Sequence, residues 1–150
     1  MVSVRRRWRV PGYSMVFWAC FIALVLLPLL ALAIEVGRYS FARAEVAKAA
    51  DAAALAAAIE IDRSVFRETG LVVVTPQAWA EAQAYASLNT GYLSSLGVHA
   101  MVTGIEVDNG NRTVEVVVSA NLERLFPSII PNIMVSEVGL ASVRAETLAR

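Results

Sequence analysis

The feature that most constrains this chain is a stretch without a charged side chain, over residues 13–34. At a rise of about 1.5 Å per residue, a helix over this stretch is about 33 Å long, which is enough to cross a hydrocarbon core of about 30 Å. Trp8, Tyr13 and Trp18 cluster near its start, where aromatic rings favour the headgroup region. Pro28 is tolerable inside it, because neighbouring helices or a local distortion can satisfy the carbonyl that it frees. We therefore expect one transmembrane helix here.

The charge distribution predicts how this helix is oriented. Arg5, Arg6, Arg7 and Arg9 precede the apolar stretch, and basic residues favour the cytoplasmic side. The formal net charge is zero, with 13 basic and 13 acidic residues, but all the acidic residues follow these arginines. The part after residue 10 therefore carries a net charge of about −4, which argues against nucleic-acid binding. We expect the N-terminus in the cytoplasm and the residues after Ile34 outside it.

Three other interpretations of the apolar stretch fit the sequence less well. A cleaved signal peptide fits the Ala-Leu-Ala sequence at residues 31–33, but its apolar region normally has about 7–15 residues. A lipoprotein is disfavoured because the apolar residues mostly follow Cys20, whereas they should precede the lipidated cysteine. A buried core helix is disfavoured, because the stretch is too long for the core of a protein of 150 residues. Cys20 is also the single cysteine, so no intrachain disulfide can form.

An alanine-rich sequence follows the apolar stretch and predicts that the helix continues to residue 68. Residues 44–58 are dominated by alanine, the best helix former. Val46, Ala50, Ala53, Ala57 and Ile61 recur at spacings of three and four, which places them on one helix face. We expect the outer half of this helix to need a covering element, because it would be marginally stable alone in water.

The remaining sequence predicts a second helix. Gly70 ends the first helical unit, and the fate of the apolar residues 71–74 is left open. Thr75 is suited to be an N-cap and Pro76 to occupy the first helical position. The helix is expected to reach about Leu88 and to continue weakly to residue 96, past a stop signal at residues 89–91.

The C-terminal third predicts strands. Residues 98–108 and 113–120 flank Asn109-Gly110, the strongest short hairpin signal. A two-residue turn there would pair Ile105 with Val114 and Met101 with Val118. One face of the hairpin would then carry Met101, Ile105, Val107, Val114, Val116 and Val118. Residues 122–126 are expected to form a short helical turn, and residues 134–145 a third strand with Gly139 as a possible bulge.

These elements make an α+β fold in which a long N-terminal helix packs on a small antiparallel sheet. We divide the chain into a cytoplasmic basic segment (1–12), the transmembrane helix (13–34), its extracytoplasmic continuation (35–68) and a small extracytoplasmic α+β domain (69–150). The apolar face of the sheet is expected to pack on the alanine face of the helix.

Residues 12–57 resemble a known family. The pattern consists of the arginine cluster, Gly12, the apolar stretch, Glu-Val-Gly-Arg at residues 35–38, and Ala-Ala-Asp-Ala-Ala-Ala-Leu-Ala at residues 49–56. This arrangement is similar to that of the TadE/TadG-like proteins of the bacterial tight-adherence (Flp) pilus assembly system. The resemblance implies a non-enzymatic protein of pilus assembly, adhesion and secretion, with no cofactor. Its implied partners are the lipid bilayer and other subunits of the pilus or secretion machine, with no nucleic acid and no small-molecule substrate.

One departure from the family bears on processing. Pilin-like members that are cleaved by prepilin peptidase carry a glycine followed five residues later by a glutamate. In this chain Phe17 is the fifth residue after Gly12. We therefore expect no cleavage at Gly12 and an anchor that stays intact.

Glu35, Arg38 and Asp51 are the candidate interaction residues. Glu35 could pair with a basic group of a neighbouring subunit, or with Arg38 three residues later on the same helix. Asp51 could mark a subunit contact, or lie on the exposed side of the helix with Lys48 as its partner. The alanine face could likewise be a docking surface between subunits or the floor of the domain's own core, and the core is the favoured interpretation.

The sequence offers no combination of residues that predicts catalysis. His99 is the single histidine, and Cys20 is placed in the apolar stretch, so neither a metal site nor a Cys/His pair is expected. Nucleophile and phosphate-binding motifs are also lacking. The alternatives to a pilus role are a membrane-tethered envelope binding module and, with less support, an envelope hydrolase that uses His99.

Overall fold

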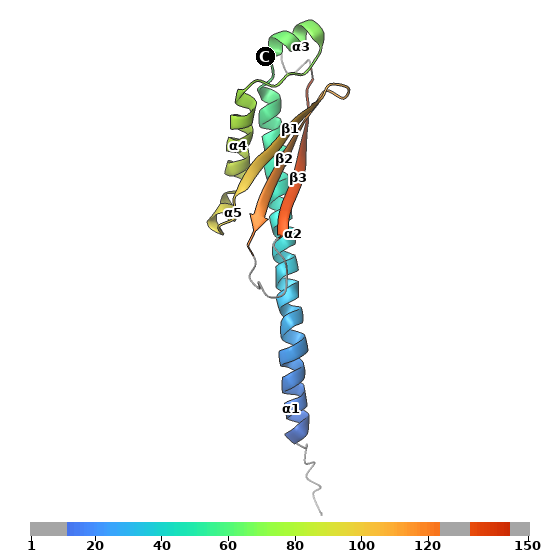
Figure 1. Ribbon diagram of the computed structural model, residues 1–150, viewed down its shortest axis with the longest axis vertical. Helices are drawn as coiled ribbons and strands as arrows, with labels where there is room; N and C mark the ends of the chain where they lie inside the picture. The colour runs from blue at the N-terminus through green and yellow to red at the C-terminus, as the bar shows by residue number, and fades with distance from the viewer. Residues whose placement is uncertain (1–11, 124–132, 145–150) are drawn as a thin grey trace, which may run out of the picture. The chain divides into compact units, whose positions relative to one another are not determined.

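The computed structural model describes residues 12–123 and 133–144, and the chain divides into two compact units, Met1–Gly37 and Arg38–Arg150. Figure 1 shows the elements along the chain. In order they are α1 (Gly12–Phe21), the π-helical η1 (Ile22–Leu26), α2 (Leu27–Ile59), α3 (Arg63–Thr69), α4 (Gln77–Asn89), α5 (Gly91–Ser95), β1 (Ala100–Asp108), β2 (Thr113–Leu122) and β3 (Ile133–Ser142).

The first unit is helical and exposes its apolar side chains. Phe17, Leu24 and Leu29 are each more than half exposed, and no residue of η1 is buried. Within residues 12–123 and 133–144, one helical stretch is long and apolar enough to cross a membrane by length and composition, and it begins at Ser14. The length and apolar character expected for residues 13–34 are therefore present in the structure.

The distortion expected around Pro28 takes the form of a π-helical turn. The N–H of Leu27 donates to the carbonyl of Ile22, five residues earlier, instead of four. Proline has no N–H to donate, and its ring crowds the carbonyl four residues before it. The wider turn just ahead of Pro28 relieves this crowding and keeps neighbouring backbone groups hydrogen-bonded.

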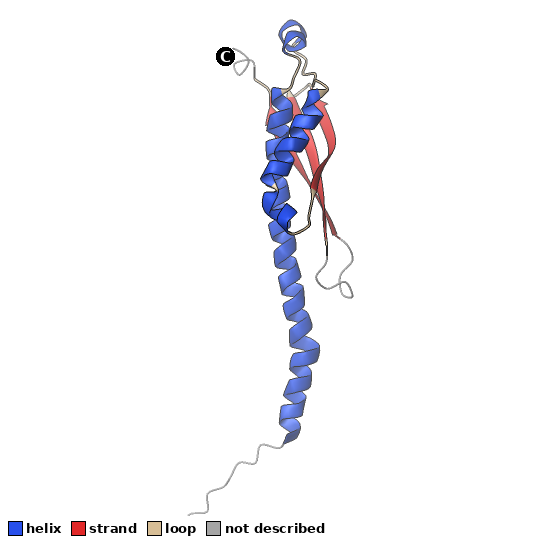
Figure 2. Ribbon diagram, turned by 90° about the vertical axis from the view of Figure 1, so that its left-hand side faces the viewer, coloured by secondary structure: helices blue, strands red, loops and turns tan. Residues whose placement is uncertain are grey.

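The second unit has two layers, as Figure 2 shows: α4 and the later part of α2 lie on one face of a three-stranded sheet. The sheet is antiparallel, with strand order β1-β2-β3. The expected α+β fold, with a long N-terminal helix packed on a small antiparallel sheet, is confirmed.

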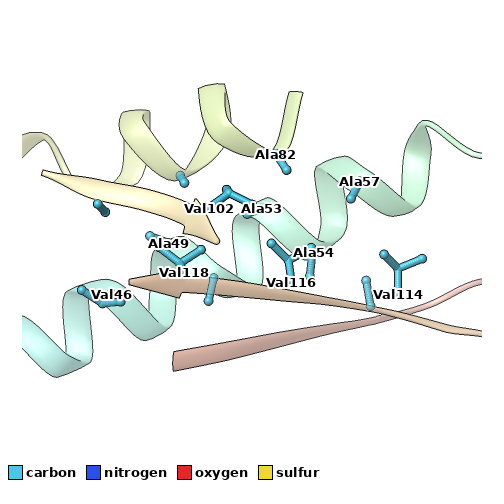
Figure 3. Packing of buried hydrophobic residues seen from close by; sticks show 14 of the residues in the cluster. Val46, Ala49, Ala53, Ala54, Ala57, Ala82, Val102, Val114, Val116 and Val118 are labelled. Carbon is cyan, nitrogen blue, oxygen red and sulfur yellow. The ribbon is translucent and has the colours of Figure 1, made fainter. Parts of the chain in front are cut away.

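Small residues on the helices and valines on the strands form the core. Figure 3 shows the helix side chains opposite those of β1 and β2. All five residues of the expected helix face are at most 4% exposed: Val46, Ala50, Ala53, Ala57 and Ile61. From β2, Val114, Val116 and Val118 are fully buried, and α4 contributes Ala78, Ala82 and Ala86. The alanine face is therefore the floor of the domain's own core, as favoured.

At Gly139 the backbone of α2 approaches the sheet closely. A Cβ atom on Gly139 would lie 2.0 Å from the carbonyl oxygen of Ala50 and 2.6 Å from the backbone nitrogen of Asp51. The bulge considered for Gly139 is wrong, because β2 and β3 pair without a register shift and Gly139 stands opposite Val116. Glycine occurs here because the helix backbone takes the space of a side chain.

The β1–β2 hairpin exists, but its turn is longer than expected. Asp108 pairs with Thr113, so the loop has four residues, and Ile105 pairs with Val116 instead of Val114. Asp108 accepts hydrogen bonds from the backbone nitrogens of Gly110 and Asn111. The side chain of Asn109 contacts another segment, because its Oδ1 accepts a hydrogen bond from the N–H of Val72 at 2.6 Å. These side-chain bonds favour the longer loop over a two-residue turn.

The core face predicted for β1 is wrong at Met101, because the strand contains a bulge. The register shifts between Val102 and Gly104, so Met101 pairs with Ser119 and not with Val118. A shift of one residue moves a side chain to the other face of a sheet. Met101 is accordingly 63% exposed, and Val102 lies in the core in its place.

The long helix ends earlier than expected. α2 stops at Ile59, and Ile61 forms a β-bridge with Val74, which requires extended backbone at residues 60–62. Asp62 then caps a separate helix, α3, by accepting hydrogen bonds from the backbone nitrogens of Ser64 and Val65. Gly70 ends α3 in a left-handed conformation with φ of 73°. The helix predicted over residues 35–68 is therefore interrupted by a capped turn.

The second helix is confirmed, with a different start. α4 begins at Gln77, Pro76 holds the N-cap position and no side chain caps the helix, so the predicted cap at Thr75 is wrong. The N–H of Thr75 donates to the carbonyl of Glu60, which holds Thr75 beside the extended segment. The stop near residues 89–91 and the weak continuation correspond to the break at Thr90 and to α5.

The third strand is also confirmed, as β3 over Ile133–Ser142. The short helical turn expected over residues 122–126 is wrong at its first residue, because Leu122 ends β2 and pairs with Ile133. Residues 124–126 lie outside the described part of the chain.

We predict that Gly139→Ala strongly destabilises the second unit, by about 1–3 kcal/mol or more, because the added methyl group would overlap the backbone of α2. Thermal unfolding of the full chain in detergent micelles, followed by near-ultraviolet circular dichroism, measures the effect. Gly104→Ala is the matched control, since a Cβ there would meet only Val117 at an ordinary distance of 3.7 Å. Equal melting temperatures for the two variants would contradict the close approach.

We predict that Asp62 contributes to the acid sensitivity of the fold. Its pKa is lowered from 3.8 by the hydrogen bond from the Ser64 hydroxyl, and further by the backbone N–H groups of Val65 and Ser64. This stabilisation is complete above the unfolded pKa and is lost as the pH falls through the lower folded pKa.

Asp62→Asn keeps an acceptor oxygen for the cap but cannot titrate. Its melting temperature should therefore fall less than that of the unmodified protein between about pH 5 and pH 2. Asp51→Asn is the control, because Asp51 is exposed and caps no helix. Parallel curves for Asp62→Asn and the unmodified protein would rule out the role of this cap.

Candidate interaction site

The three residues singled out from the sequence do not form one site. Arg38 and Asp51 are separated along α2 by about 20 Å, at a rise of about 1.5 Å per residue. The guanidinium of Arg38 donates to the backbone carbonyl of Glu123, just after β2, at 3.3 Å. Glu35 belongs to the first unit and is only 4% exposed. The four arginines that predict the topology, Arg5, Arg6, Arg7 and Arg9, lie outside the described residues.

Asp51 lies on the exposed side of α2, but its expected partner is engaged elsewhere. Lys48 pairs with Glu45, with 2.5 Å between Nζ and Oε1, so the pairing of Lys48 with Asp51 is wrong. The side chain of Asp51 is exposed, while Ala50 and Ala53 on either side of it are fully buried. The alanine run therefore has two faces, one packed on the sheet and one, with Asp51, available to a partner.

An ion pair that the sequence did not reveal ties α2 to β3. Arg43 Nε lies 2.5 Å from Glu137 Oε1, and the two side chains are 61% and 21% exposed. The hydrogen bond and the negative charge of Glu137 raise the pKa of the Arg43 guanidinium. Since the two residues are 94 positions apart, no local pattern could have indicated this pair.

The two edges of the sheet are treated differently. At β1, the side chain of Gln83 from α4 accepts from the N–H of Val102 at 2.8 Å and donates to the carbonyl of Ala100 at 3.3 Å. The amide thus occupies backbone groups that would otherwise be open to another strand. At β3, the described residues add no further strand, and Glu137 with its partner Arg43 stands beside this edge.

The sheet face turned away from the helices, which we call the open face, is mixed in character. Thr103, Ser119 and Ser136 form a row of hydroxyl groups across the three strands, with oxygens 3.2 and 3.0 Å apart. Exposed apolar side chains flank this row: Met101, Met134, Val138 and Leu140. Toward the hairpin end, Glu106 and Glu115 stand directly opposite each other on β1 and β2.

A cavity of about 240 Å³ lies between the end of α2 and the end of β3, and we call it the Arg63 pocket. Its walls are apolar and are formed by Leu55, Ala58, Ile59 and Val143. Its polar groups are Arg63, Ser142 and Arg144. An apolar cavity with cationic groups suits an aliphatic group that carries a negative charge.

The residues considered for chemistry are dispersed. His99 is exposed just before β1, and Cys20 is exposed in α1. Across residues 12–123 and 133–144, no group of three or more His, Cys, Asp or Glu side chains is placed to hold a metal ion. What the described residues do offer is exposed surface that can bind other molecules: the outer side of α2, the open face and the Arg63 pocket.

Comparison with known proteins gives one finding. Neither the curated proteins nor the solved structures gave a match to this chain. A family model does match, over residues 12–60, and this region comprises α1, η1 and α2. The resemblance is thereby confirmed: residues 12–60 match the family described as putative Flp pilus-assembly TadE/G-like.

Proposed function

We propose that this protein is a non-enzymatic, membrane-anchored component of a bacterial Flp (tight-adherence) pilus assembly system. The family match over residues 12–60 is the observation that carries the proposal. The matched region ends one residue after α2, so it coincides with the helices that supply the apolar stretch and the alanine face. The proposed partners are the lipid bilayer and other subunits of the machine, with Glu35, Arg38 and Asp51 as candidate contacts.

The proposed location is the inner membrane, crossed once by residues 13–34. The exposed apolar side chains of the first unit support this, because lipid can cover a surface that no described residue covers. The arginines before residue 10 favour a cytoplasmic N-terminus. Residues 35–150 would then lie outside the cytoplasm, with the anchor uncleaved.

We predict that a cysteine at Ser95, exposed in α5, is labelled by a membrane-impermeant maleimide in intact spheroplasts. The variant is Ser95→Cys in a Cys20→Ser background, which removes the single native cysteine. A cysteine at Ser3 is the control and should react only after permeabilisation. The opposite labelling pattern would refute the proposed topology.

We predict that deletion of the gene abolishes surface filaments and lowers adhesion, and that the unmodified gene restores both. Electron microscopy and a surface-binding assay measure the outcome. Normal filaments and adhesion in the deletion strain would refute the pilus role. In the complemented strain, the amounts of the protein in sheared filaments and in the membrane fraction separate a filament subunit from an assembly component.

A membrane-tethered binding module unrelated to pili is the second candidate. The open face favours it, because Met134 and Leu140 expose apolar side chains beside hydroxyl groups that can bind a partner. This candidate predicts a stable partner and a deletion strain with normal filaments.

A further inference from the structure

Two arginines at the Arg63 pocket lack a counterion within the described part of the chain. Arg63 and Arg144 are both exposed and form no described ion pair. The acidic neighbour of Arg63 in sequence, Asp62, uses its carboxylate to accept from Ser64 and Val65 at the start of α3. Two positive charges beside one apolar cavity repel each other, and a negative group from another molecule would relieve this repulsion.

The open face carries an excess of negative charge near the hairpin. Glu106 and Glu115 stand directly opposite each other, an arrangement that is unfavourable for like charges. Arg112, in the loop that joins their strands, makes no described ion pair with either glutamate. On the other side of Glu115, its partner on β3 is Leu140, which is 61% exposed. We call Glu106, Glu115 and Leu140 the acidic ridge.

We propose that the acidic ridge of one copy of this chain docks in the Arg63 pocket of a second copy. The charges are complementary, since two carboxylates would meet two guanidinium groups, none of which forms an ion pair within the described residues. Leu140 supplies an apolar group that can pack against Leu55 and Ile59 in the pocket wall.

The size of the cavity supports a side chain as the occupant. Cavities that bind small organic ligands usually measure about 300–1,000 Å³, whereas the Arg63 pocket has about 240 Å³. A pocket of this size holds one or two aliphatic side chains. An aliphatic anchor in a pocket, surrounded by charged pairs at the rim, is the common anatomy of a protein–protein contact.

The positions of the two surfaces suit copies that stand side by side. Ser142, at the pocket, pairs with Thr113, two residues before Glu115 on the same strand. Ridge and pocket therefore lie at the same end of the second unit. A contact between them can keep the α2 helices of both copies pointing the same way, as anchoring in one bilayer requires. This part of the inference rests on the proposed membrane anchoring, whereas the contact itself rests on charge and shape.

The test is disulfide cross-linking between two differently tagged full-length variants, co-reconstituted in phospholipid vesicles in a Cys20→Ser background. One variant carries Leu55→Cys in the pocket wall and the other Leu140→Cys in the ridge. We expect a cross-linked heterodimer under mild oxidation. Leu88→Cys, on α4 and more exposed than Leu140 (76% against 61%), replaces Leu140→Cys as the control and should still cross-link at least about fivefold less.

Charge reversal tests the electrostatic part. Glu115→Arg in the ridge variant should lower the cross-linking yield at least about fivefold, and Arg63→Glu in the pocket variant should restore it. Glu81→Arg, an exposed acid on α4, should leave the yield unchanged. A yield for the ridge–pocket pair no higher than for the Leu88 control, or no rescue by the reversed pair, would overturn the inference. Normal filaments in a deletion strain would instead refute the pilus role and leave this result untouched.

Discussion

The packing of an alanine-rich helix face directly on a valine-rich sheet is the constraint on which the second unit depends. Side chains larger than alanine at positions 50, 53 or 57 would hold the helix away from the strands, and at Gly139 even a methyl group has no room beside the carbonyl of Ala50. Close packing of small residues leaves little freedom to slide, because interiors are dense and an added methylene is felt. The glycine on β3 thus fixes the position of the sheet along α2.

Polar contacts at the margins secure this packing against alternatives. Arg43 and Glu137 join α2 to the edge strand, and Gln83 closes the opposite edge with its amide. An exposed ion pair contributes little stability on average, so the pair with Glu137 is better understood as setting register than as holding the layers together. The apolar layer supplies the stability, and the polar contacts add to the specificity that the close packing at Gly139 already provides.

The sequence predicted the elements whose periodicity is strong and missed the details that depend on single side chains. The apolar stretch, the alanine face, α4 and the three strands follow from patterns that extend over many residues. The turn after Asp108, the bulge beside Thr103 and the helix break at Asp62 depend instead on individual hydrogen bonds or register shifts. The Arg63 pocket is lined by segments about 80 residues apart in the sequence, so no local pattern could have predicted it.

The two faces of the alanine run explain why a family pattern can be confined to this helix. Its buried face must stay small to admit the sheet, so Ala50 and Ala53 are fixed by packing. Its outer face, with Asp51, is exposed and has no such constraint from the described core. The sheet needs only valine-sized residues on one face and a glycine at the closest approach, which many sequences satisfy. The family match over residues 12–60, which ends with α2, is therefore consistent with this packing.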